Sequence, residues 1–508
     1  MRRSIAATLL VALASCATHP ATTMPAAPAP VAARSDTAFT VPQRAVLVAA
    51  DPRAIEAIIA EGTQRSHAGD DLEYLTDVIG PRLTSSAAMK RANDWTAEKF
   101  RAYGLENVHL EPWKFGQAWT RGPITVRMTA PHERWLTAAS WAWAPGTNGP
   151  VSGDAAYMDA NTREDFDARF AGKLRGKWVL TSAAFPLRNP DGPPMTRADS
   201  VRSDSLRRAF FRRPASPFRD SLLTVLSAEG IAGYVGAGTK EYGLLNMSGS
   251  PARIYPFPFF VVDNETYGQV QRLLARGKRV TLEANIRNTM GGDSVTVYNT
   301  VAEIRGSERP DEVVLLGAHL DSWDLGTGTT DNGTGSIAVL EAARILKASG
   351  VRPKRTIRFA LFSGEEEGLY GSRMYARDHA SELSSFQAVL VLDNGTGRIT
   401  GMALQGRDEL GDMWRSLFAP VSALGPFHVR SGNKGGTDHL SFLPAGVPGF
   451  NYDQESRGYD HTHHSQVDTY DHAVIPDVIQ AATVMAATAY QLANLGELLP
   501  RNAVSATR

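Results

Sequence analysis

The stretch Gly317-Ala-His-Leu-Asp-Ser-Trp-Asp-Leu-Gly-Thr-Gly-Thr-Thr-Asp-Asn-Gly-Thr-Gly335 decides how this sequence is interpreted, because it places polar residues inside a glycine-rich loop. The apolar run 313–316 before it predicts a buried strand, and the spacing of apolar residues over 337–346 predicts a helix. A buried strand, a polar loop and a helix are how open α/β sheets build sites at the carboxyl ends of their strands. His319 and Asp331 are therefore candidate ligands at the edge of a sheet.

Three further loops in the second half of the chain have the same character. One carries consecutive glutamates, one begins with an aspartate and one is rich in histidine; they are 364–372, 393–397 and 461–469. The first two directly follow apolar runs at 357–362 and 389–392 that predict buried strands. Strands that alternate with helices predict an α/β fold with a mixed, mostly parallel sheet and helices on both faces.

The acids at these strand ends need a partner of opposite charge. A carboxylate buried at the end of an apolar strand is costly unless it is paired or bound to a metal. Arg358 precedes the end of its strand, and Arg398 is the only cation close in sequence to Asp393. Histidine and carboxylate ligands without thiolates suit a catalytic zinc ion. Two histidines and three carboxylates would serve two ions if one carboxylate bridges them.

In this order, the four loops resemble the dinuclear-zinc exopeptidase family that includes carboxypeptidase Q and the bacterial co-catalytic zinc aminopeptidases. The stretch 319–331 is most similar to the carboxypeptidase Q branch, whereas Glu365-Glu366-x-Gly-Leu-x-Gly-Ser is more similar to the aminopeptidases. The resemblance covers about 72–118 and 295–495. It implies the zinc exopeptidase fold and hydrolysis of peptides by metal-activated water.

The resemblance implies that five side chains bind two zinc ions: His319, Asp331, Glu366, Asp393 and His464. Asp331 would bridge the ions together with a water or hydroxide, with His319 and Asp393 on the first ion. Glu366 and His464 would complete the second ion. A cofactor of two Zn²⁺ per chain is therefore expected.

The resemblance also implies roles beside the metal. Glu365 would be the general base that takes the proton of the bridging water and passes it to the leaving amine. Asp321 would accept a hydrogen bond from the outer nitrogen of His319. In several relatives the position of His463 holds a tyrosine that stabilises the oxyanion. Here it holds a histidine, and a histidine is also found there in the carboxypeptidase Q branch. These three residues complete the predicted catalytic set.

Other positions extend or depart from the family pattern. Asn332 stands where the family usually has a second aspartate, at a position that often follows a cis peptide bond. Asp468 would support the metal site near His464. His439 lies in 436–442, a segment that matches the surroundings of the family's substrate pocket.

The leading hypothesis is an exopeptidase that acts on short peptides or dipeptides and releases N-terminal residues. The alternative is a dipeptidase or carboxypeptidase of the carboxypeptidase Q type. A remoter alternative is an acyltransferase of the glutaminyl cyclase type, whose relatives resemble single-zinc sites without the first histidine, and His319 argues against it. A non-catalytic binding module is disfavoured because all five ligands are present. A serine hydrolase and the other class of zinc protease are disfavoured because the chain contains neither Gly-x-Ser-x-Gly nor His-Glu-x-x-His.

The length and local composition of the chain predict more than one domain. With 508 residues, it is too long for one ordinary core. Short strand-like runs separated by turns over 120–289 predict a mostly β insert that resembles a protease-associated domain. The insert would divide the peptidase domain into 46–119, which includes a predicted helix at 86–103, and 290–500, which carries the metal site. A tail, 501–508, follows.

Charge and cysteine usage indicate partners and location. The formal net charge of +0 argues against nucleic-acid binding, and 187–220 has acids interleaved with its arginines, as in a solvated excursion. The basic start, an apolar run and Leu-Ala-Ser-Cys16 predict a bacterial lipoprotein signal peptide over 1–16, with an Ala/Pro-rich tether over 17–45. A lipid on Cys16, the only cysteine, would anchor an exported monomer or homodimer to a membrane facing the periplasm or cell exterior.

Overall fold

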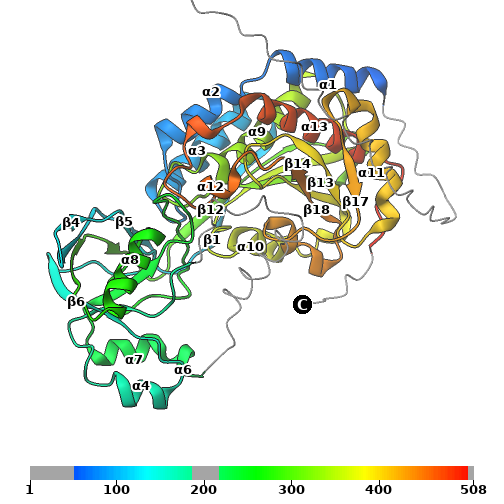
Figure 1. Ribbon diagram of the computed structural model, residues 1–508. Coiled ribbons are helices and arrows are strands. Elements are labelled where there is room, and N and C mark those ends of the chain that lie inside the picture. Colours follow the sequence, from blue (N-terminus) through cyan, green and yellow to red (C-terminus); the bar gives the residue numbers. More distant parts are fainter. Residues whose placement is uncertain (1–50, 186–216, 502–508) are drawn as a thin grey trace, which may run out of the picture. The chain divides into compact units, whose positions relative to one another are not determined.

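The computed structural model describes residues 51–185 and 217–501, and Figure 1 colours its elements along the chain. The predicted signal peptide with Cys16, the tether, nearly all of 187–220 and most of the tail lie outside the described residues. None of the helices in the described ranges combines the length and the apolar character that a membrane span requires.

The predicted peptidase region forms one eight-stranded sheet. Its strands are β1 (Glu106–Lys114), β12 (Thr296–Ile304), β13 (Arg309–His319), β14 (Arg355–Phe362), β15 (Phe386–Val391), β16 (Ile399–Ala403), β17 (His428–Arg430) and β18 (Gly449–Gln454). Their order across the sheet is β1-β12-β14-β13-β15-β18-β16-β17. The central run from β14 through β13 and β15 to β18 is parallel, and antiparallel pairs flank it. The predicted mixed, mostly parallel sheet is confirmed.

Helices cover both faces of this sheet. They are α1 (Pro52–Gln64), α2 (Ala68–Glu73), α3 (Ala87–Ala102), α9 (Thr334–Ala348), α10 (Tyr370–Asp378), α11 (Gly411–Phe418), α12 (Tyr459–Thr462) and α13 (Ile475–Ala493). A π-type turn, η1 (Tyr74–Ile79), extends α2. Figure 1 shows α1, α9 and α13 on one side of the sheet and α10 on the other. The helix predicted over 86–103 begins where the side chain of Ser86 accepts a hydrogen bond from the main-chain N–H of Met89.

The apolar run in β13 shows why the strand is buried on both faces. Val314 and Leu316 pack in the cluster that contains α9 and α13, whereas Val313 and Leu315 pack in the cluster that contains Tyr375 of α10. Because side chains alternate along a strand, a continuous apolar run satisfies both layers of helices. After this run, the next polar side chain along the chain is that of His319, the last residue of β13.

The central part of the chain forms a second eight-stranded sheet. Its strands are β3 (Ile124–Ala130), β4 (Arg134–Trp135), β5 (Ala138–Ser140), β6 (Val151–Tyr157), β7 (Trp178–Leu180), β8 (Gly233–Ala237), β9 (Phe259–Val262) and β10 (Thr281–Ile286). The order is β4-β3-β10-β6-β7-β8-β9-β5. β2 (Trp119–Thr120) and β11 (Thr289–Met290) pair with each other where the chain enters and leaves this part. The resemblance of this part to a protease-associated domain stays a prediction.

The second sheet carries more helix than we predicted. Its helices are α4 (Arg163–Arg169), α6 (Pro217–Asp220), α7 (Leu222–Glu229) and α8 (Asn264–Ala275). The start of α4 could have been predicted from Thr162, a residue type that often caps helices. Its side chain accepts a hydrogen bond from the N–H of Asp165. Short 3-10 turns complete the described chain at Leu383–Ser385, Asp408–Leu410, Ala419–Leu424, Asp438–Ser441, Leu443–Ala445 and Tyr470–His472.

Candidate metal centre

The predicted ligands converge on the carboxyl edge of the parallel strands. His319 is the last residue of β13, and Asp331 lies in the turn η2 (Thr329–Gly333) that leads into α9. Glu366 follows β14 and Asp393 follows β15, each within a few residues of the strand's end. His464 comes from the loop after α12. Parallel strands end at a common edge, so four loops far apart in sequence meet there.

His319 is held with one nitrogen turned toward the acids. Its side chain is 1% exposed, and Nδ1 lies 3.0 Å from the main-chain carbonyl oxygen of Asp321. Because a carbonyl can only accept, Nδ1 donates, and Nε2 is the nitrogen that faces the acids and could bind a metal ion. The Asp321 carboxylate, which we predicted as the acceptor, lies 3.7 Å from Nδ1. The residue is the predicted one, but the group that orients the imidazole is its carbonyl.

Two groups of side chains share Asp331. His319 Nε2 lies 3.4 Å from Asp331 Oδ1 and 3.4 Å from Asp393 Oδ1. His464 Nε2 lies 3.4 Å from Asp331 Oδ2 and 2.9 Å from Glu366 Oε2. Each histidine thus faces its own oxygen of Asp331 and has one further carboxylate beside it. This is the disposition expected of a bridging carboxylate between two cations.

The chemistry of the donors fits metal ions. His319 Nε2 and Asp331 Oδ2 are buried and have no hydrogen-bond partner among the described residues. Burial opposes a charge on His319, yet Asp393 and Glu365 raise its pKa well above the usual range. Burial, with the Asp331 carboxylate, raises the pKa of Glu366. The acids therefore require positive charge at this place, which a divalent cation supplies.

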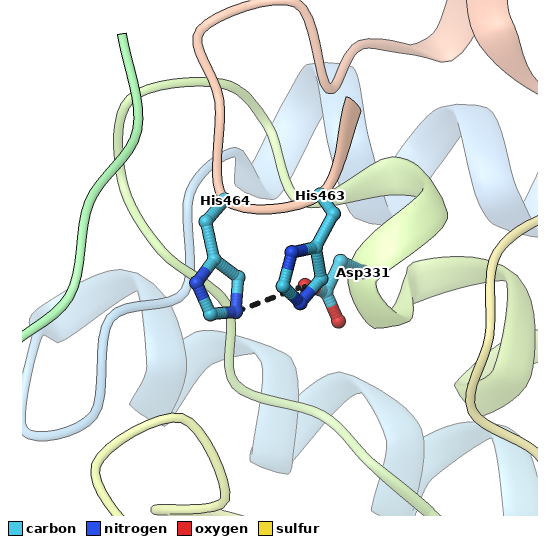
Figure 2. A group of neighbouring side chains, drawn as sticks. All are labelled: Asp331, His463 and His464. Atoms are coloured by element: carbon cyan, nitrogen blue, oxygen red, sulfur yellow. Dashed lines mark ion pairs between the residues drawn. The ribbon is translucent and has the colours of Figure 1, made fainter. Parts of the chain in front are cut away.

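His463 stands beside the second group. Its ring stacks on that of His464 with centroids 3.7 Å apart, and its Nε2 lies 3.8 Å from Asp331 Oδ2. Figure 2 shows the two rings side by side with Asp331 behind them. The His463 side chain is 46% exposed, so it borders the site from the solvent side. Asp331, His463 and His464 are also close enough to hold an ion together, which makes His463 an alternative ligand to Glu366.

Glu365 lies next to the first group without belonging to it. Its Oε2 is 3.9 Å from His319 Nε2, and its side chain is 12% exposed. Burial raises the pKa of Glu365 well above the usual range, and the neighbouring Asp393 and Asp438 carboxylates act in the same direction. A carboxylate with a raised pKa is a stronger base, as proton abstraction requires.

The main chain at Asp331 is tightly held. The Asp331–Asn332 peptide bond is cis. Asn332 donates from Nδ2 to the carbonyl oxygen of Leu392 at 2.9 Å and accepts from the N–H of Gly335 at 3.1 Å. The amide side chain therefore ties the turn to the end of β15 and to the start of α9. Asn332, which departs from the family pattern, has a place here that uses both its donor and its acceptor.

Other predicted residues lie outside the two groups. His439 is buried, and its Nε2 contacts the carbonyl oxygen of Lys434 at 3.0 Å. Asp468 accepts hydrogen bonds from the N–H groups of Thr330 and Asp331, so it contacts the predicted metal site through the main chain of Asp331.

Two buried side chains near the site, those of Arg82 and Asp438, are not among the residues predicted from the sequence. The Arg82 guanidinium is fully buried beside the loop between His319 and Asp331. Asp438 is also buried, and within the described ranges neither of its carboxylate oxygens has a hydrogen-bond partner. It lies in the 436–442 segment, where only His439 drew attention.

A buried parallel sheet with histidines and carboxylates gathered around one shared aspartate defines a hydrolytic metal centre. The sequence model of Peptidase family M28 matches residues 299–489. Carboxypeptidase Q of Bos taurus is 30% identical over 443 residues, which cover 87% of this chain and 88% of that protein. The chain therefore belongs to peptidase family M28 and is a metallo-exopeptidase, as the resemblance implied.

Solved structures agree with this fold. The Peptidase M28 precursor from Shewanella amazonensis SB2B is 27% identical with a TM-score of 0.71, covering 89% of this chain and 98% of that chain. BSAP, a zinc aminopeptidase from Bacillus subtilis, is 20% identical with a TM-score of 0.57, covering 84% of this chain and 93% of that chain. The second comparison supports the fold alone.

Proposed function

We propose that this protein is a zinc-dependent exopeptidase that hydrolyses the terminal peptide bond of short peptides or dipeptides. The observation that carries the proposal is the position of Asp331, whose two oxygens each lie 3.4 Å from a different histidine. His319 and Asp393 would hold one zinc ion, and Glu366 and His464 would hold the second. Zinc, when bound, supplies a Lewis acid and lowers the pKa of water at the site.

The chain's own residues would then manage the proton. Glu365 is placed to take a proton from the attacking water, because its carboxylate borders the first group and has a raised pKa. The water oxygen bonds to the scissile carbonyl carbon, the carbon–nitrogen bond breaks, and the proton passes from Glu365 to the leaving nitrogen. His463, half exposed beside His464, is placed to donate to the carbonyl oxygen as negative charge develops there.

The extent of similarity bears on which end of the peptide is read. The sequence led us to expect release of N-terminal residues. However, the sequence of carboxypeptidase Q of Bos taurus aligns over 88% of its length and 87% of this chain. Sequence similarity to aminopeptidase YwaD of Bacillus subtilis covers only 35% of this chain. This difference favours carboxypeptidase Q-like action on peptides with a free C-terminus, with aminopeptidase action as the second candidate.

A panel of small substrates tests the proposal directly. Hydrolysis rates are measured for free dipeptides, N-blocked peptides and C-amidated peptides, with and without a chelator. Carboxypeptidase-like action is expected to tolerate a blocked N-terminus and to fail on amidated peptides, whereas an aminopeptidase would show the reverse. The proposal is wrong if no peptide is cleaved, or if cleavage continues after complete removal of the metal. One tightly bound zinc per chain together with cyclisation of N-terminal glutamine would instead support the acyltransferase alternative.

The proposal extends to domains and location. We place a protease-associated-like insert at 120–289, which the second sheet within 124–286 supports. The sequence at 1–16 supports export and a lipid anchor on Cys16, with no nucleic acid as partner. Expression of the full chain in a bacterium is expected to give membrane-associated enzyme. The Cys16→Ala variant should then appear in the soluble fraction if the anchor is real.

A further inference from the structure

We propose that Arg82 and Asp468 are a pair of positioning residues that together fix the main chain of Asp331, and so set the affinity of both metal ions. The inference rests on the proposed two-zinc site and adds residues from two distant segments of the chain. Neither side chain reaches the metal groups as a ligand. Each acts on the loop that joins His319 to Asp331.

Arg82 holds the carbonyl groups of this loop. Its guanidinium donates from Nε to the carbonyl oxygen of Leu320 at 2.7 Å, from Nη1 to that of Thr327 at 2.8 Å, and from Nη2 to that of Gly328 at 2.6 Å. Nη1 also contacts the carbonyl oxygen of Gly80 at 3.2 Å, within its own segment. The planar fork therefore spans the loop from the residue after His319 to a point just before Asp331.

Asp468 holds the N–H groups of the same loop. One of its carboxyl oxygens accepts from the N–H of Thr330 at 2.6 Å, and the other accepts from the N–H of Asp331 at 3.1 Å. Its own main-chain carbonyl accepts from the N–H of Thr327 at 2.8 Å. The Asp468 side chain is 3% exposed, so these bonds form away from water. Carbonyls bound by Arg82 and N–H groups bound by Asp468 leave the loop little freedom.

The backbone between the two clamps is closely packed. Gly328 has a φ of +65°, and a Cβ there would lie 2.2 Å from Cβ of Ser322 and 2.9 Å from Nη2 of Arg82. Only glycine allows the loop to approach the guanidinium this closely. The orientation of Asp331, which must present one oxygen to each histidine, is therefore determined by contacts that lie behind the metal groups.

Because Asp331 would bind both ions, this inference predicts a distinctive pattern of zinc affinities. A variant that disturbs Asp331 weakens both ions, whereas a variant of a ligand to one ion weakens that ion first. Metal-ligand supports of this kind typically change metal affinity by roughly 10–100-fold. We expect Asp468→Asn and Arg82→Lys each to reduce the affinity for both zinc ions in that range. Asparagine turns an N–H donor toward a main-chain N–H, and lysine cannot span three carbonyls.

Two control variants match the chemistry elsewhere in the chain. Arg407 is buried and donates to the carbonyl oxygens of Pro500 and Gly446 at 2.8 and 3.1 Å. Asp263 is buried and accepts from the N–H and hydroxyl of Thr266, both at 2.8 Å. Arg407→Lys and Asp263→Asn should lower the melting temperature of the metal-free protein while leaving zinc affinity unchanged.

The experiment is zinc titration of the metal-free full chain against a competing chelator, together with thermal melting of each metal-free variant. The inference is overturned if Asp468→Asn and Arg82→Lys bind both ions with wild-type affinity, or if only one ion is weakened. Should Asp468→Asn fail to fold, Arg82→Lys decides alone, because it retains the charge. Zinc alone is the probe, so a wild-type chain that binds two ions but cleaves no peptide would defeat the proposed function and leave this inference standing.

Discussion

The Nδ1 nitrogen of His319 donates to the main-chain carbonyl of Asp321 at 3.0 Å, rather than to that residue's carboxylate. The carboxylate is occupied elsewhere. Its Oδ2 accepts from the N–H of Glu366 at 3.2 Å and from the hydroxyl of Thr84 at 3.2 Å. Asp321 therefore orients one proposed ligand through its main chain and supports another through its side chain.

This division of roles predicts different outcomes for two substitutions. Asp321→Asn keeps an oxygen that can accept from the Glu366 N–H, and the carbonyl that orients His319 is unchanged. We expect zinc affinity close to that of the wild type. Asp321→Ala leaves the Glu366 N–H without its acceptor, and zinc affinity should fall by roughly 10–100-fold. Chelator competition measures both. Equal loss in the two variants would show that the charge of Asp321, not its acceptor, matters.

Removal of the proposed base should separate catalysis from metal binding. Glu365→Gln retains the shape of the side chain but cannot take a proton. We expect kcat to fall by about 10²–10⁴-fold, with the zinc content unchanged. Steady-state rates and elemental analysis on the same preparation provide the measurement. A variant that works at the wild-type rate, or that loses its zinc, would remove Glu365 from the base role.

Metal stoichiometry should distinguish a shared ligand from a ligand to one ion. Asp393 lies in the first group only, whereas Asp331 belongs to both. Asp393→Ala is therefore expected to retain one zinc ion per chain, and Asp331→Ala to retain none after dialysis. Asp378→Ala serves as a control, because Asp378 forms an ion pair with Arg377 and both side chains are exposed. Retention of a zinc ion by Asp331→Ala would contradict the bridging role.

A cluster distant from the metal gives a prediction about pH. Glu111 in β1 lies 3.0 Å from Nε2 of His379 and 3.1 Å from Nε2 of His109. Burial alone would raise the pKa of Glu111, but hydrogen bonds from the two histidines outweigh it and lower the pKa from 4.5 to about 2. The bond to Glu111 raises the pKa of His379 above 6.5.

The directions of these two pKa shifts define the pH range in which the cluster stabilises the fold. The Glu111 contribution is present above pH 4.5 and is lost as the pH falls toward 2. The His379 contribution is present below pH 6.5 and is lost as the pH rises through its raised pKa. Glu111→Gln should therefore lower the melting temperature most between these limits. Lys90→Met, which breaks an exposed pair with Asp94, should have little effect at any pH. A Glu111→Gln effect independent of pH would refute the charge assignment.

Much of the site could be predicted because its residues obey a local rule. Each of His319, Glu366 and Asp393 stands at the end of an apolar strand, where acids and histidines cannot lie without a partner. The sheet and the main helices followed from apolar spacing for the same reason. Repeating periods and strand-end positions are visible in a single sequence.

What could not be predicted depends on contacts across long separations. Arg82 meets Leu320 from 238 residues away, and nothing near Arg82 in sequence indicates that its guanidinium binds main-chain carbonyls. The short helices α4 and α7 are held by the second sheet rather than by strong periodicity. Which atom of Asp321 faces His319 is a matter of loop conformation, so the residue could be chosen but its acting group could not.

His319 is the last residue of β13, so its place along the sheet depends on how 313–316 seats between the two layers of helices. A slip of one residue would carry the imidazole about 3.3 Å along the strand, which exceeds the length of a zinc–nitrogen bond, about 2.0–2.1 Å. The aliphatic side chains that hold that register are buried in the two hydrophobic clusters. Their packing nevertheless sets the position of the reactive centre, so looser packing of these side chains would misplace the groups that carry out the chemistry.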